Sequence, residues 1–197
     1  MDIKKGYVRV TDLLKPYQDW GTIPKEVLEA KAQIGTNVHE AIENYSVGLP
    51  EPKLTVREAK YYDSYLKWAE YEEPMYLCNE ERYYDEDLKV TGQVDCIVTF
   101  PGRHTGRILD FKTSAKESPL HWPLQACWYY MLCKKNKKDV SETTHMLQLK
   151  DNGSPAKLYT YTATPELQKL CLSLYDAYTY FNSHKKDKNE EHSAWCC

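Results

Sequence analysis

The stretch Ile108-Leu109-Asp110-Phe111-Lys112 combines a short apolar strand with a carboxylate and an ammonium group. Side chains two positions apart on a strand share a face, so Asp110 and Lys112 point to one side while Leu109 and Phe111 point into a core. A carboxylate beside an ammonium can hold a divalent cation and position a phosphate or a water next to it. The same Asp/Glu-x-Lys pattern occurs elsewhere, in each case without an apolar strand before it, at Asp2, Glu29, Glu51, Glu58 and Asp87. The pattern at Asp110 is therefore the candidate for chemistry.

Asp95 adds a second carboxylate on the preceding strand. A short loop joins that strand to the one at Asp110, so the two are expected to form an antiparallel hairpin. We expect a register in which Phe100 faces Arg107. Asp95 then lies opposite Lys112 and shares one patch with Asp110 and Lys112, since opposed Cβ atoms lie ~5 Å apart. The alternative is a cross-strand salt bridge on a solvent face, and a shift of one residue would remove Asp95 from the patch.

Four more polar residues are candidates with two interpretations each. His39 borders the apolar stripe of an expected helix, where a lone histidine is usually a hydrogen-bonded boundary residue. Gln125 and Tyr129 lie one turn apart on another expected helix, and such a pair is most often a helix-surface hydrogen bond. Glu80 opens the first expected strand of the sheet, where an isolated glutamate is commonly solvated. Only their combination with the Asp110 strand favours a functional role.

The order of predicted elements defines the fold class. Helical spacing of apolar residues predicts helices over about 25–45, 55–72, 123–134 and 165–182. Strand patterns cover residues 75–84, 90–100, 106–111, 143–149 and 157–162. This order predicts one α/β or α+β domain over residues 1–184, with its core at about 31–162. Residues 185–197 are polar and are expected to form a flexible tail.

Composition limits the class of partner and compartment. The chain has 26 Lys and Arg against 29 Asp and Glu, a formal net charge of −3, which argues against binding to nucleic acid by bulk electrostatics alone. It lacks an apolar run of the ~18–20 residues that a membrane span needs, and its N-terminus lacks the apolar core of a secretory signal. Seven cysteines without a C-x-x-C pair predict a reducing cytoplasm, with the thiols filling core space.

Five short motifs follow one another in a fixed order: Gly35–His39, Glu80, Gly92–Asp95, Asp110–Lys112 and Gln125–Tyr129. In this combination the chain resembles the PD-(D/E)XK nuclease superfamily and, within it, the RecB-like exonuclease branch. The resemblance covers about residues 31–132 and implies a restriction-endonuclease-like core, a mixed β-sheet flanked by helices in the order αβββαβ. Val8–Leu14 and Tyr83–Leu88 are also similar to phage-borne members of the branch.

The resemblance implies a metal-dependent deoxyribonuclease, an exonuclease of DNA processing, recombination, repair or replication. Asp95, Asp110 and the backbone carbonyl of Phe111 would bind Mg²⁺ or Mn²⁺ in such an enzyme. His39 would be a further ligand, as in the members of the family that carry this histidine. Glu80 would bind through water or aid a second ion.

The remaining motif residues have implied roles beside the metal. Lys112 would orient the attacking water and stabilise the growing charge, and Gln125 and Tyr129 would hold Lys112 or the nucleic-acid backbone in place. Some members of the branch hold an iron–sulfur cluster through one Cys before the histidine motif and three after the Gln–Tyr helix. This chain has no Cys before Cys78, so no iron–sulfur cluster is expected.

The expected partner is DNA, as a single strand or a strand end in preference to an intact duplex. A recombinase, helicase or single-strand-binding protein would be the protein partner, and no membrane partner is expected. The basic run Lys134–Lys138 is either a solvated turn at a helix C-terminus or a phosphate-contacting edge. Two competing interpretations of the whole chain are a non-catalytic nucleic-acid-binding or scaffold domain of this fold and an unrelated α+β interaction module.

Overall fold

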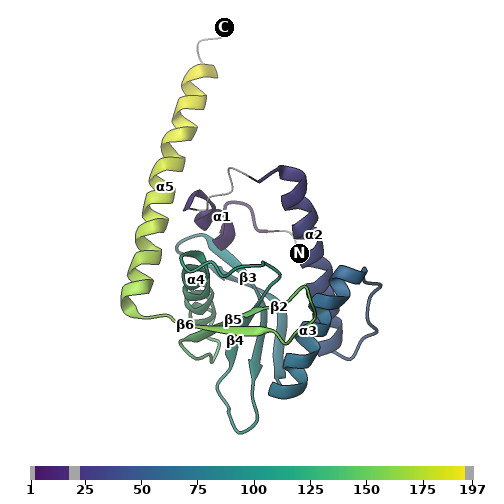
Figure 1. Cartoon of the computed structure of the whole chain (residues 1–197). Coiled ribbons are helices and arrows are strands. Elements are labelled where there is room, and N and C mark those ends of the chain that lie inside the picture. The colour runs from purple at the N-terminus through teal and green to yellow at the C-terminus, as the bar shows by residue number, and fades with distance from the viewer. Residues whose placement is uncertain (1–2, 18–22, 194–197) are drawn as a thin grey trace.

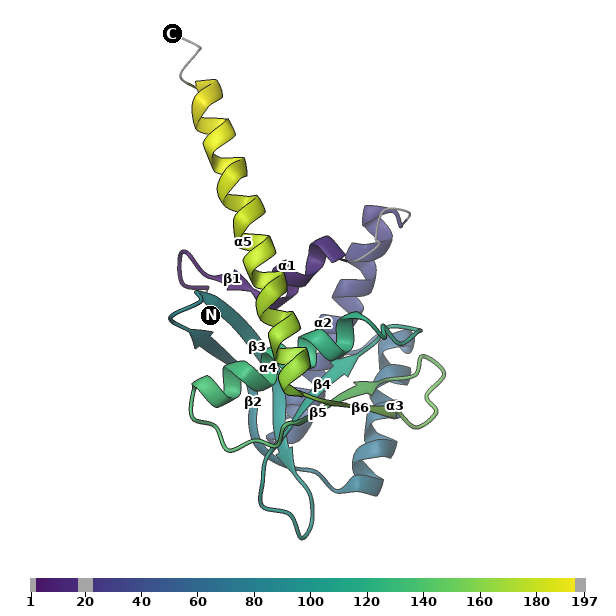
Figure 2. The ribbon, with the colours of Figure 1, turned by 90° about the vertical axis from the view of Figure 1, so that its left-hand side faces the viewer.

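A mixed sheet of six strands runs through the molecule, with helices on both faces (Figures 1 and 2). The computed structural model describes residues 3–17 and 23–193. The elements are β1 (Val8–Arg9), α1 (Val10–Leu14), a 3₁₀ turn (Lys15–Tyr17), α2 (Lys25–Ser46), α3 (Val56–Glu72), β2 (Met75–Asp85), β3 (Val90–Thr99), β4 (Arg107–Lys112), α4 (His121–Lys135), β5 (Thr143–Gln148), β6 (Lys157–Thr162) and α5 (Pro165–Ser193). The predicted fold class, a mixed sheet flanked by helices, is confirmed.

Strand β3 is paired differently along its two edges. One edge pairs with the antiparallel strand β2 at residues 90–94 and 96–99. The other edge pairs with β4 at residues 96–98 and with the parallel strand β1 at residues 90–91. Within the described chain, residues 92–95 have no strand partner on that second edge. This gap, called the open edge of β3 below, contains Asp95.

Helices α2 and α3 cover one face of the sheet, and α4 covers the other (Figures 1 and 2). The first interface is rich in aromatic residues and consists of Val38, Ile42, Tyr61, Tyr65 and Trp68 packed on Cys96, Val98, Leu109 and Phe111. The second consists of Leu124, Cys127, Trp128 and Leu132 packed on Val90, Val94, Ile97 and Ile108. Helix α5 packs beside α4 at its start and then extends away from the body in both views.

The β3–β4 hairpin does not have the predicted register. Val98, and not Phe100, pairs with Arg107. The loop is longer than predicted because its residues bond to one another: Thr99 Oγ1 donates to the Arg103 carbonyl at 2.7 Å, and the Arg103 amide donates to the Phe100 carbonyl at 2.9 Å. These contacts take the end of β3 out of the ladder.

This register moves Asp95 along the sheet. The last β3–β4 pair is Cys96–Leu109, so Asp95 lies level with Asp110 and not with Lys112. Because the shift is two residues, each side chain keeps its predicted face. Asp95 remains close enough to Asp110 and Lys112 for their charges to shift the pKa of its carboxyl group.

The final helix is longer than predicted. It continues to Ser193, past the predicted end at residue 182, so most of the predicted tail is helical. No Gly or Pro follows Pro165, and residues 185–191 are mostly Lys and Glu, which are good helix formers. Residues 194–197 lie outside the described part of the chain, and with them two of the cysteines.

The cysteines within the described residues belong to the core, as predicted. Cys96, Cys127, Cys133 and Cys171 are buried, and Cys78 is partly buried. Helices with the length and apolar character needed to cross a membrane are absent from the described residues.

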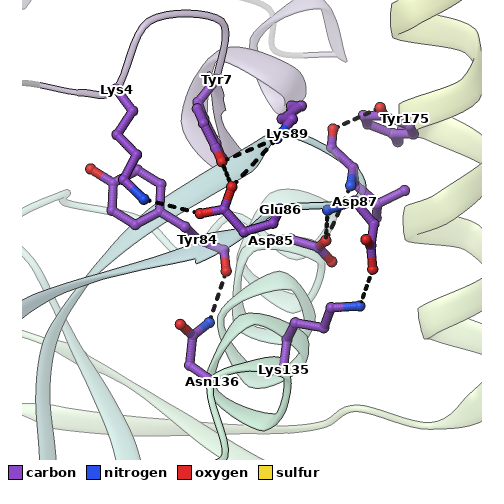
Figure 3. A network of polar contacts seen from close by, with 11 residues as sticks. Lys4, Tyr7, Tyr84, Asp85, Glu86, Asp87, Lys89, Lys135, Asn136 and Tyr175 are labelled. Carbon is purple, nitrogen blue, oxygen red and sulfur yellow. Dashed lines mark hydrogen bonds and ion pairs between the residues drawn. The ribbon is translucent and has the colours of Figure 1, made fainter.

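The turn between β2 and β3 anchors three distant segments (Figure 3). Glu86 Oε1 lies 3.0 Å from Lys4 Nζ of the N-terminal segment. Asp87 Oδ2 lies 2.5 Å from Lys135 Nζ of α4. Tyr175 of α5 donates its hydroxyl to a carbonyl of the turn at 2.7 Å. The acids of this turn are therefore structural contacts.

The basic run at the end of α4 takes part in the same kind of contact. Besides Lys135, Lys138 Nζ lies 2.9 and 3.0 Å from the two carboxylate oxygens of Glu81. Two of its four lysines therefore neutralise acids of β2 and its turn. These contacts favour the structural interpretation of the run over a phosphate-contacting edge.

Candidate active site

Three side chains with ligand atoms for a metal converge at the open edge of β3. His39 comes from α2, Glu80 from β2 and Asp95 from β3. His39 Nδ1 lies 3.6 Å from Asp95 Oδ2 and 3.8 Å from Glu80 Oε1. The ligand atoms of all three residues lie within 4.8 Å of one another. We call His39, Glu80 and Asp95 the edge cluster.

The backbone of Phe111 on β4 holds two members of the edge cluster. Its N–H donates to Asp95 Oδ2 at 2.6 Å, and its carbonyl lies 3.2 Å from His39 Nε2. A carbonyl can only accept, so Nε2 carries the proton, and Nδ1 of the neutral ring presents a lone pair. That lone pair faces the oxygens of Glu80 and Asp95. An imidazole lone pair and two carboxylates that converge in this way could hold a metal ion.

Burial sets the protonation of the edge cluster. It lowers the pKa of His39, although the carboxylates of Asp110 and Glu80 oppose this shift. Burial, reinforced by Asp110, raises the pKa of Asp95 well above its usual range. Burial, reinforced by Asp95, raises the pKa of Glu80 to about 7. A bound divalent cation would offset this cost because it favours the ionised carboxylates and the neutral imidazole.

A second polar group begins at the end of β4. Lys112 Nζ lies 2.5 Å from Asp110 Oδ2 and donates to Gln125 Oε1 at 2.9 Å. Gln125 Nε2 donates in turn to the Tyr129 hydroxyl at 2.8 Å. Asp110 Oδ2 is buried and makes no directed hydrogen bond with a described residue, so the nearby ammonium is what compensates its charge. We call Asp110, Lys112, Gln125 and Tyr129 the lysine relay.

The structure places every predicted site residue at the open edge of β3, in two groups. Phe111 connects them, since it lies between Asp110 and Lys112 in sequence and bonds to the edge cluster through its backbone. Asp110 is not among the three grouped metal-ligand side chains, and its carboxylate faces Lys112. The Phe111 carbonyl lies at the site, in contact with His39.

Comparison with known protein families identifies the superfamily of this chain. A sequence model of the PD-(D/E)XK nuclease superfamily matches residues 53–191, more than half of the chain. The chain belongs to the PD-(D/E)XK nuclease superfamily. Glu80, Asp95 and the lysine relay lie within the matched residues, and His39 precedes them.

The other comparisons add less to this family assignment. No curated protein matches the chain. A solved structure titled "Crystal structure of SSO0001" has 15% identical residues and a TM-score of 0.49, with 92% of this chain and 78% of that chain covered.

Two glycines allow the close packing of this PD-(D/E)XK site. A Cβ atom at Gly92 would lie 2.9 Å from the Tyr129 ring and from the Leu132 side chain, so only glycine lets α4 lie this close to β3. A Cβ atom at Gly35 would lie 3.4 Å from Thr113 Oγ1, at the limit of ordinary van der Waals contact, so α2 lies against the segment after β4. The motif glycines thus bring the two helices with site residues against the open edge.

The sequence analysis missed two residues of this site, Gln93 and Arg82. Gln93 Nε2 donates to Glu80 Oε2 at 2.6 Å, and the Arg82 guanidinium donates to Gln93 Oε1. Glu80 itself has a left-handed backbone with φ of +47°, unusual for a non-glycine residue. The position of Gln93, two residues before Asp95 on one strand, is a signal that it shares the face of Asp95. Nothing in the sequence signals its contact with Arg82.

Proposed function

We propose that this chain is a metal-dependent exonuclease of the RecB-like branch, phage-type, that hydrolyses phosphodiester bonds of DNA with Mg²⁺ or Mn²⁺. The observation that carries the proposal is the convergence of the His39 Nδ1 lone pair with the carboxylates of Glu80 and Asp95, next to Lys112. Membership of the PD-(D/E)XK superfamily, whose nucleases use divalent metals, supports the reaction class. The Gly35–His39 motif supports the RecB-like branch.

The donor set fits a hard divalent cation. Carboxylate oxygens and one imidazole nitrogen, without sulfur, suit Mg²⁺ or Mn²⁺ better than a structural zinc ion. Asp95 and His39 would hold the ion together with Asp110 and the Phe111 carbonyl, and Glu80 would do so directly or through water. When bound, the ion supplies a Lewis acid for the phosphate and lowers the pKa of a water.

Lys112 supplies a fixed positive charge for the substrate phosphate. Asp110 and Gln125 hold its ammonium group, and Tyr129 holds Gln125. A cation fixed before the reaction stabilises the negative charge that grows in the transition state without the cost of reorganisation. The same ammonium group can orient the attacking water. Gln125 and Tyr129 are therefore proposed as positioning residues for Lys112.

The substrate is proposed to be DNA that is engaged locally, at a strand end or an unpaired segment. The net charge of −3 disfavours extended coating of a duplex. Metal binding at the acidic open edge would reverse the local field where a phosphate must lie. A small enzyme of this charge can therefore bind one strand at its site without a large basic surface.

A digestion panel tests this proposal. Linear, end-blocked and circular DNA, single- and double-stranded, and a linear RNA are incubated with Mg²⁺ or Mn²⁺. We expect cleavage of linear DNA only. Lys112→Gln should lower the rate by about 10²–10³, the loss typical of one preorganised charge at a reacting oxyanion. Lys135→Gln, a matched lysine that also pairs with an acid, should retain the wild-type rate.

Three other results of the digestion panel would contradict parts of the proposal. Cleavage of circular DNA would contradict the exonuclease mode, and preferred cleavage of RNA would contradict the DNA substrate. No cleavage of any substrate by the wild-type protein would contradict the nuclease and leave a non-catalytic nucleic-acid-binding domain.

A further inference from the structure

A cavity of about 310 Å³ lies beside the candidate active site. Helices α2 and α3 and the segment that follows β4 form its walls. Leu28 and Ala32 of α2 and Tyr61 of α3 contribute apolar surface, and the Tyr61 ring belongs to the core beneath. The volume is at the lower end of the range of roughly 300–1,000 Å³ typical of small-molecule sites. It suits a single flat ring system.

The cavity adjoins two chain segments that carry residues of the candidate active site. Thr113, which lines it, directly follows Lys112 of the lysine relay. Helix α2, which forms one wall, also carries His39 of the edge cluster. The close approach of Gly35 to Thr113 joins these two walls at the end nearest the site. The cavity and the candidate active site therefore share the wall formed by α2 and the chain segment that leaves β4.

The charge at the rim of the cavity is positive and uncompensated. Lys31 of α2 and Arg57 of α3 line it and are exposed, and none of the lining residues is acidic. Neither cation makes a hydrogen bond or an ion pair with any residue that the structure describes. The nearest acid in sequence to Arg57, Glu58, is buried and already accepts from Thr55 and Asn37. Two unpaired cations around an apolar floor match a nucleotide, which has a flat base between anionic phosphates.

We infer that this cavity binds one unpaired nucleotide of the DNA strand, next to the phosphate that is cleaved. Its base packs against Ala32, Leu28 and Tyr61, and Lys31 and Arg57 contact the flanking phosphates. A base that is paired in a duplex must leave its partner to enter, so the cavity selects DNA with an unpaired strand over a blunt duplex. This inference rests on the proposed nuclease function and names the substrate class of that site.

A tryptophan inside the cavity tests the inference. Ala32→Trp fills the cavity from an exposed helix position, and Ala30→Trp places the same ring on the same helix away from the cavity. Binding of a fluorescein-labelled oligothymidylate is measured by anisotropy with Ca²⁺ in place of the catalytic ion. We expect Ala32→Trp to weaken binding by about ten-fold or more, the size of one lost base contact, and Ala30→Trp to bind as the wild type does.

A charge variant provides a second test that does not alter packing. Lys31→Gln with Arg57→Gln should weaken binding and flatten its dependence on salt, because two phosphate contacts are lost. The matched control is Lys25→Gln with Lys60→Gln, two exposed lysines on the same two helices outside the cavity. Equal affinity of the cavity variants and the wild type would overturn the inference.

A substrate without a base separates this inference from the proposed function. Hydrolysis of bis(p-nitrophenyl) phosphate in Mn²⁺ needs the metal and Lys112 but no nucleotide cavity. Ala32→Trp should hydrolyse it at the wild-type rate while losing its preference for overhanging over blunt DNA. Loss of both activities in Ala32→Trp would contradict a separate cavity function. Absence of both activities in the wild-type protein would contradict the nuclease, and oligothymidylate binding would still decide whether the cavity binds a nucleotide.

Discussion

The β2–β3 hairpin carries acidic residues at its turn and at the open edge of β3, and the two sets differ in what neutralises them. At the turn, Glu86 and Asp87 are exposed and contact Lys4 and Lys135 (Figure 3). Hydrogen bonds from these lysines lower the pKa of both carboxyl groups. The negative charges of Glu86 and Asp87 are therefore balanced by lysines of the same chain.

At the open edge the acids are half-buried and lie close to one another. Burial raises the pKa of Glu80 to about 7 and that of Asp95 well above its usual range. Each carboxylate accepts one neutral hydrogen bond, Glu80 from Gln93 and Asp95 from the Phe111 amide, and no Lys or Arg among the described residues forms an ion pair with either. The same residue types in one hairpin thus form a stable contact in one place and an unfavourable cluster in the other. Unfavourable clusters of this kind are typical of functional sites, because the ligand supplies the missing charge.

The largest difference between the two sets should be in catalysis. Asp95→Asn should lower DNA cleavage by about 10³ or more, since it removes a proposed metal ligand, which would be worth several kcal/mol in the transition state. Asp87→Asn removes an acid from the turn of the same hairpin and should cleave at the wild-type rate. Both rates are measured on one linear DNA substrate in Mn²⁺. Equal rates in both variants would remove the functional distinction between the two sets.

Stability without metal should depend on pH through the edge cluster. The pKa of Glu80 is about 7 in the folded chain and near 4.5 when unfolded, so the unfolded state loses its proton first. Folding stability is then full below pH 4.5 and falls as the pH rises through 7, by roughly 1–3 kcal/mol. Urea midpoints in EDTA between pH 5 and 8 measure this slope.

Glu80→Gln is the control for this slope, because it cannot ionise and still accepts the hydrogen bond from Gln93. It should flatten the dependence on pH. Mn²⁺ should reverse the wild-type trend, since it binds the deprotonated ligands more tightly at high pH. A stability that rises with pH in EDTA would show that Glu80 is ionised without metal.

Without metal, the edge cluster should make the wild-type protein less stable than a variant that lacks one of its carboxyl groups. Asp95→Asn removes a carboxyl group whose ionisation is unfavourable at this half-buried position and keeps an oxygen that accepts from the Phe111 amide. Its Tm in EDTA should rise by about 2–4 °C, the shift that 1 kcal/mol produces in a chain of this size. Added Mn²⁺ should raise the Tm of the wild type more than that of the variant. A lower Tm in EDTA for Asp95→Asn would mean that the ionised carboxylate stabilises the fold.

Much of the fold and part of the candidate site could be predicted from the sequence. Helical and strand periodicity gave the main elements close to their observed bounds, because each long element buries one regular apolar face. Alternation along β4 placed Asp110 and Lys112 on one face. The positions of these side chains depend on local geometry, which a sequence pattern expresses directly.

The features of the fold and the site that the sequence did not predict depend on contacts between residues that no local sequence pattern reveals. The β3–β4 register was wrong because Thr99 and Arg103 bond to each other inside the loop. Gln93 contacts Glu80, whose backbone is left-handed, and a strand pattern predicts neither the contact nor this backbone conformation. The pairing of Lys138 with Glu81 joins residues far apart in sequence, so the basic run alone could not distinguish a structural from a phosphate-binding role.

The smallest change in stability should come from substitutions in the turn between β2 and β3. The side chains of Lys135 and Asp87 are 47% and 76% exposed, so water and salt screen their attraction. Asp87→Asn, Lys135→Gln and the double variant should each change the Tm by less than about 1 °C, and the differences should vanish in 1 M NaCl. A larger coupling between the two single variants, or one that persists in high salt, would mean that the turn holds α4 in place and supports the lysine relay through that helix. The two sets of acids would then differ in exposure but not in their importance for the site.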